Sequence, residues 1–71
     1  MSITPEQAQK LLRGSYTFNQ LGFSMLITRL KGIYARDSSE AALQMCVDEI
    51  NVFLQKYSAI ITKDVAVISQ L

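Results

Sequence analysis

The chain has 71 residues, of which 49% are hydrophobic and 18% charged, and its seven basic and six acidic side chains leave a net charge of +1. A disordered chain would be poorer in hydrophobic residues and richer in charge, so we predict one folded helical domain over residues 1–71. The near-neutral balance argues against a general attraction to nucleic acid or to a membrane surface.

The side-chain inventory argues against catalysis. The chain has no histidine, which is both the commonest metal ligand and the commonest general acid or base, and Cys46 is its only cysteine. We expect Cys46 to be buried as a small hydrophobic residue with a raised pKa rather than to act as a nucleophile. Phosphate-binding glycine loops, CxxC pairs and calcium loops are also missing from the sequence. We therefore expect no enzymatic activity, no cofactor and no metal.

No segment indicates export or membrane insertion. The opening residues 1–5 lack the basic and then apolar pattern of a secretory signal. The uncharged run over residues 14–28 is shorter than the roughly 20 residues of a spanning helix, and it contains several polar side chains. Together with the lone cysteine, these features favour a cytoplasmic protein without membrane contact.

The first predicted helix begins at Pro5. Thr4 is suited to cap it, Pro5 to occupy its first position, and Gln7 to complete a capping box. Apolar residues then follow at alternating steps of three and four, which predicts a helix over about 5–35. Gly14 and Gly22 interrupt this pattern, and they are equally compatible with a kink, with close helix packing and with simple tolerance.

A stop and a new start lie between Arg36 and Glu40. Basic residues precede this point and acidic residues follow it, as the helix dipole favours, and Asp37 or Ser38 is the expected cap. We predict a second helix over about 38–68, antiparallel to the first because the connection is short. Beyond Tyr57 the β-branched residues become frequent, so a short β-ribbon within residues 60–71 is the alternative.

The apolar stripe between Leu43 and Ile61 is too wide for one neighbouring helix to cover. Two antiparallel helices enclose no interior, so we predict an all-α antiparallel helical hairpin that dimerises into a four-helix bundle. A break at Gly14-Ser15 would instead give a compact three-helix monomer. The predicted core and interface positions are Leu12, Tyr16, Asn19, Phe23, Leu26, Leu30, Leu43, Val47, Ile50, Phe53, Leu54, Tyr57 and Ile61.

Polar and charged residues add details to this hairpin. Asn19 lies in phase with the apolar face, where it could pair across an interface and fix the register, or reach water or a backbone carbonyl. Residues 1–36 carry a net charge of +4 and residues 37–71 a net charge of −3, which suits their packing against each other. Antiparallel packing predicts that Asp64 lies near Lys10 and Arg13, and that Asp48 or Glu49 lies near Arg29.

Three functions are compatible with these patterns. The leading hypothesis is a structural or protein-binding module that acts as a homo-oligomer, most simply a dimer, with another protein as a further partner. The second is a nucleic-acid-associated regulator, since the first half is basic and aromatic. Against it, Tyr16 and Phe23 fall on the apolar stripe, and Lys10 and Arg13 are about four helical turns from Arg29 and Lys31.

The third hypothesis is a self-assembling structural subunit. Lys63-Asp64-Val65 and Ile68-Ser69-Gln70-Leu71, at the end of an apolar second helix, resemble the needle subunits of type III secretion systems. The similarity covers the last third of the chain. The proline-bounded turn typical of that family is absent, and Asp37-Ser38-Ser39-Glu40 stands in its place.

Overall fold

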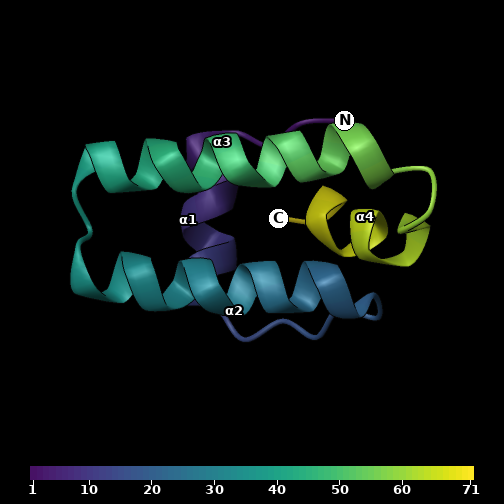
Figure 1. Cartoon of the computed structure of the whole chain (residues 1–71), viewed down its shortest axis with the longest axis horizontal. Helices are drawn as coiled ribbons and strands as arrows, with labels where there is room; N and C mark the ends of the chain where they lie inside the picture. Colours follow the sequence, from purple (N-terminus) through teal and green to yellow (C-terminus); the bar gives the residue numbers. More distant parts are fainter.

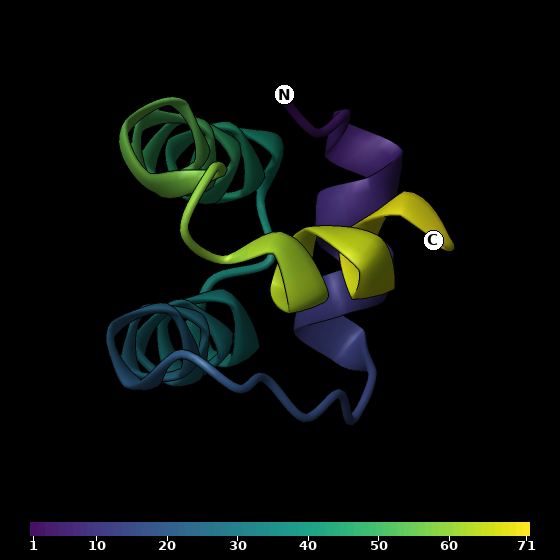
Figure 2. The same cartoon turned by 90° about the vertical axis from the view of Figure 1, so that its right-hand side faces the viewer.

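The computed structural model describes all 71 residues. It contains four helices and no strands: α1 (Pro5–Arg13), α2 (Leu21–Arg36), α3 (Glu40–Tyr57) and α4 (Thr62–Ser69). Helices α2 and α3 lie side by side and antiparallel, joined by residues 37–39, and α1 runs across them (Figure 1). Figure 2 shows that α1 and α4 lie together on one side of the α2–α3 layer. The all-α prediction is confirmed.

The N-terminus of α1 forms as the sequence indicates. The Thr4 hydroxyl accepts a hydrogen bond from the Gln7 backbone N–H at 3.1 Å, and the Thr4 N–H donates to Gln7 Oε1 at 2.9 Å. The preceding Ile3 is buried, and its backbone forms two hydrogen bonds with the side chain of Asn51 in α3. The Ile3 N–H donates to Asn51 Oδ1 at 2.7 Å, and Asn51 Nδ2 donates to the Ile3 carbonyl at 3.3 Å. The chain before α1 is therefore docked on α3.

The prediction of one helix over 5–35 was wrong, because α1 ends at Arg13 and residues 14–20 form a loop. Gly14 has an extended backbone, and a Cβ at this position would collide with the Tyr16 ring. Two tertiary contacts stabilise the loop: Lys31 Nζ donates to the Gly14 carbonyl at 2.7 Å, and Phe18 packs edge-on against Phe23 with ring centroids 4.9 Å apart. One long-range hydrogen bond and one local ring contact thus hold the loop in place.

Asp64 fixes the entrance to α2 from the opposite end of the chain. It is the one charged side chain in the core, 1% exposed, and its two carboxylate oxygens accept the backbone N–H groups of Asn19 at 2.7 Å and of Gln20 at 3.0 Å. Hydrogen bonds to an ionised acceptor are stronger than those between neutral groups. The predicted proximity of Asp64 to Lys10 and Arg13 as an ion pair was wrong, because the carboxylate turns inward to these backbone donors.

The prediction of one helix over 38–68 was also wrong, because α3 ends at Tyr57. Residues 58–61 form a turn, and the buried Ile61 precedes α4. The β-branched residues beyond it are helical, so the β-ribbon alternative is wrong as well. At the start of α3 the cap is Ser39, whose hydroxyl accepts the Ala42 N–H at 3.2 Å, rather than Asp37 or Ser38.

The two breaks, at residues 14–20 and 58–61, explain how the wide apolar stripe on α3 is covered. Cys46, Val47, Ile50 and Leu54 of α3 are buried in one apolar cluster to which all four helices contribute. The further helices needed to cover α3 were expected to come from a second chain, whereas α1 and α4 cover it within the same chain. The remaining members of the cluster are Ile3, Ala8, Leu11, Leu12, Phe18, Phe23, Ile27, Leu30, Tyr34, Ile61 and Ile68.

We expect Gly32→Ala to stabilise the protein by about 0.5–1 kcal/mol, because Gly32 lies within α2 and a Cβ there meets no atom within 4 Å. Gly22→Ala is the matched control, since its Cβ would lie 3.0 Å from Gln20 Oε1, the acceptor that caps α2. Urea unfolding measures both variants. A Gly32→Ala variant no more stable than Gly22→Ala would contradict the open environment of Gly32.

Candidate functional site

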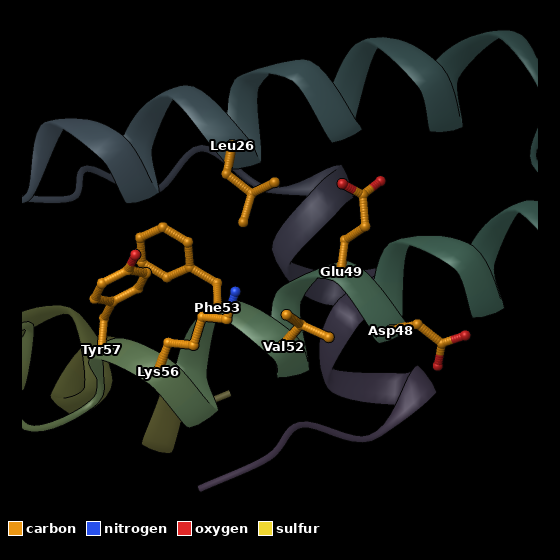
Figure 3. A pocket seen from close by; sticks show the side chains of 7 residues that line it. All are labelled: Leu26, Asp48, Glu49, Val52, Phe53, Lys56 and Tyr57. Carbon is orange, nitrogen blue, oxygen red and sulfur yellow. The ribbon is translucent and has the colours of Figure 1, made fainter.

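An apolar groove lies between α2 and α3 on the face turned away from α1 (Figure 3). Its volume is about 320 Å³, and Leu26 of α2 points into it toward Phe53 and Tyr57 of α3. The other lining residues are Asp48, Glu49, Val52 and Lys56. The groove is therefore built by the two longest helices, whose opposite faces bury the core.

A second hollow of about 360 Å³ continues this groove toward the turn after α3. It shares Phe53 and Tyr57 with the first hollow and is also lined by Gly22 and Ile60. The rings of Phe23 and Phe53 lie 5.3 Å apart, and those of Phe53 and Tyr57 lie 4.7 Å apart, so an aromatic row runs from the core to the surface. The two hollows together are called the α2–α3 groove.

Large apolar side chains remain exposed along the α2–α3 groove and beside it. Val52 is 52% exposed, and Ile60 is 74% exposed. Tyr57, which lines both hollows, is exposed as well. An apolar surface gathered in one place and rimmed by polar groups is typical of an interaction site, whereas isolated exposed apolar residues are ordinary.

Charged side chains rim the groove. Arg29 Nη2 and Glu49 Oε1 form an ion pair at 2.6 Å across α2 and α3, which confirms the expected proximity of these two residues. The hydrogen bond and the charge of Glu49 raise the pKa of Arg29 above its usual value. Asp48 and Lys56 lie along α3 on either side of Val52 (Figure 3). The Asp48 carboxylate accepts one hydrogen bond from Gln44 Nε2 at 2.9 Å.

The predicted core and interface residues divide into three groups. Leu12, Phe23, Leu30, Val47, Ile50, Leu54 and Ile61 are buried, and Leu26, Leu43 and Phe53 are half-buried. Tyr16, Asn19 and Tyr57 are exposed. The helical phase assigned to Tyr16 and Asn19 was wrong because both lie in the loop after α1, and Tyr57 lines the groove instead of the core. The roles of Asp64 and Asn51 in binding distant backbone groups were not predicted, because the sequence alone does not show which backbone groups lie beside these side chains.

The break at Gly14 also gathers basic residues that an unbroken helix would separate. Lys31 Nζ binds the Gly14 carbonyl, directly after Arg13, so the expected four-turn separation was wrong for Lys31. The Arg13 guanidinium lies 5.9 Å from the ring centroid of Tyr34, whose hydroxyl accepts a hydrogen bond from Gln9. Lys10 and Tyr16 are exposed at the same end of α1. These residues form a small basic end.

Cys46 is fully buried against the core, as the sequence predicts. Burial raises the pKa of its thiol, and the negative charge of Glu49 raises it further. A buried thiol with a raised pKa is a poor nucleophile. No group of three or more histidine, cysteine or carboxylate side chains in the structure is arranged to hold a metal ion.

We expect the Cys46 thiol to react with a disulfide reagent at least about 100-fold more slowly in the native protein than in denaturant, because the reagent reaches it only after local opening. Equal rates would contradict its burial.

Since the pKa of the Cys46 thiol is raised on folding, the contribution of this thiol to stability is complete at pH values below its pKa in the unfolded chain. That contribution is lost as pH rises through its pKa in the folded protein. The unfolding free energy should therefore fall more steeply at alkaline pH than in Cys46→Ala.

Comparison with models of protein families, with curated proteins and with solved structures finds no match to this chain. None of the four helices combines the length and the apolar character that a membrane crossing requires.

Proposed function

We propose that this protein is a non-enzymatic protein-binding module that acts as a homo-oligomer through the α2–α3 groove. The observation that carries the proposal is the groove itself, where Leu26 and Phe53 form an apolar floor and Val52, Tyr57 and Ile60 are exposed around it. Covering such side chains is worth roughly 25 cal/mol for each Å² of apolar surface removed from water. The lone thiol of Cys46 supports a location in the reducing cytoplasm.

The four-helix bundle expected from two continuous hairpins is not part of this proposal. The core is complete within one chain, so association is an addition to a folded monomer rather than a condition of folding. Such association is governed by concentration, and it raises the apparent thermal stability as concentration rises.

Sedimentation velocity between about 1 µM and about 1 mM, the range of weak to moderate affinities, tests the proposal. We expect a defined small oligomer whose fraction grows with concentration, together with a rise in melting temperature. A monomer at every concentration would overturn the homo-oligomer. Growth into open-ended assemblies would favour the self-assembling structural subunit instead.

A second candidate function, association with nucleic acid, is favoured by the basic end. Lys10, Arg13 and Lys31 surround Gly14, and Tyr16 is exposed beside them, whereas the sequence suggested scattered charges. Retention on DNA that weakens with salt would support this candidate, with a slope reduced by about 0.9 for each phosphate contact removed. The double variant Lys10→Gln and Arg13→Gln should lose that retention, while Lys63→Gln on α4 serves as the control.

A further inference from the structure

The outer face of α3 has a self-complementary pattern of charge. Val52 lies in the middle of this face, with Asp48 one helical turn before it and Lys56 one turn after it (Figure 3). Met45, one turn before Asp48, is also exposed. In order along the chain the face therefore reads apolar, acidic, apolar, basic.

This inference rests on the proposed function: the geometry points to a second copy of this chain as the occupant of the α2–α3 groove, with the two α3 helices antiparallel about a twofold axis at Val52. Twofold symmetry pairs each residue before the axis with the equivalent residue after it in the other copy. Asp48 of each copy then meets Lys56 of the other.

A parallel arrangement is disfavoured by the same charges. With two α3 helices in parallel register, Asp48 would face Asp48 and Lys56 would face Lys56. Like charges placed opposite each other are repulsive, and such repulsion suppresses incorrect pairing. The charge pattern thus selects the antiparallel orientation.

Val52 would form the centre of this interface, and the Asp48–Lys56 pairs between the two copies would form its rim, as in other interfaces.

Charge exchange on the full-length chain tests this arrangement, with the oligomeric state measured by sedimentation velocity. We expect Asp48→Lys alone and Lys56→Asp alone to weaken self-association at least about tenfold, since each places two like-charged pairs at the interface. An equimolar mixture of the two variants should recover association, because every facing pair is then opposite in charge. The double variant in one chain should recover it as well.

Two further variants make the outcome decisive. Val52→Asp should abolish association by placing two carboxylates on the axis, and it should keep the native circular dichroism spectrum because Val52 is 52% exposed. Lys10→Asp makes the same charge change as Lys56→Asp on the exposed side of α1 and should leave association intact. If the wild type is monomeric throughout, the proposed function fails; if it associates and neither Val52→Asp nor the charge variants affect it, only the α3 arrangement is overturned.

Discussion

Asp64→Ala is expected to destabilise the protein by about 3–5 kcal/mol, because it leaves the backbone N–H groups of Asn19 and Gln20 without their acceptor and opens a cavity beside them. A domain of this length has a total stability of about 4–10 kcal/mol. The variant should therefore be largely unfolded or close to its transition under native conditions. Urea unfolding followed by circular dichroism measures the difference.

The variants Asp64→Asn and Lys63→Ala test whether loss of the carboxylate acceptor causes this destabilisation. Asp64→Asn retains one carbonyl acceptor and should lie between the wild type and Asp64→Ala. Lys63→Ala changes the exposed neighbour in the same helix and should stay within about 0.5 kcal/mol of the wild type. An Asp64→Ala variant as stable as Lys63→Ala would show that the loop before α2 does not depend on this carboxylate.

Ile50→Asp is expected to unfold the protein completely. Ile50 is fully buried in α3 at the centre of the four-helix core. The substitution loses roughly 1.5–3 kcal/mol of apolar burial and adds the larger free energy of burying a carboxylate without a partner. The sum exceeds the stability expected of a 71-residue chain. Loss of the helical circular dichroism signal and of cooperative thermal unfolding measures the result.

Val52→Asp is the matched control for this substitution, two residues farther along α3 but on its exposed face. It should remain folded and lose only self-association. Ile50→Val adds a measurable intermediate, with a loss of about 0.5–1.5 kcal/mol. A folded Ile50→Asp variant would mean that the buried face of α3 has been assigned incorrectly.

Local signals in the sequence predicted the helix boundaries where hydrogen bonds join residues close together in the chain. The Thr4–Gln7 capping box is of this kind, whereas the end of α3 at Tyr57 was not predicted, because one helix through residue 68 was expected. The break over residues 58–61 was missed, and a break at Gly14-Ser15 was only an alternative, because both segments carry apolar side chains in helical phase, such as Tyr16 and Ile61. The loop over residues 14–20 is stabilised by Asp64 and Lys31, which act across distances in sequence that periodicity cannot register.

The groove illustrates the same division between local and tertiary information. Tyr57 belongs to the predicted stripe yet is exposed, and periodicity alone does not show which part of so wide a stripe faces the core and which faces solvent. The separation follows from α1, which packs on one side of the α2–α3 layer and leaves the other side open. The Arg29–Glu49 pair was predictable because an antiparallel connection at residues 37–39 brings these residues together in any case.

The sequence by itself determined that the chain is helical, where α1 begins, that Cys46 is buried, and that α3 needs more than one neighbouring helix. These properties follow from capping groups, apolar periodicity and composition, which act within a few residues. Only the tertiary structure decided which helices cover α3 and which face remains open. That choice depends on the long-range contacts of Asp64, Asn51 and Lys31, which hold the loop between α1 and α2 and dock the segment before α1 onto α3.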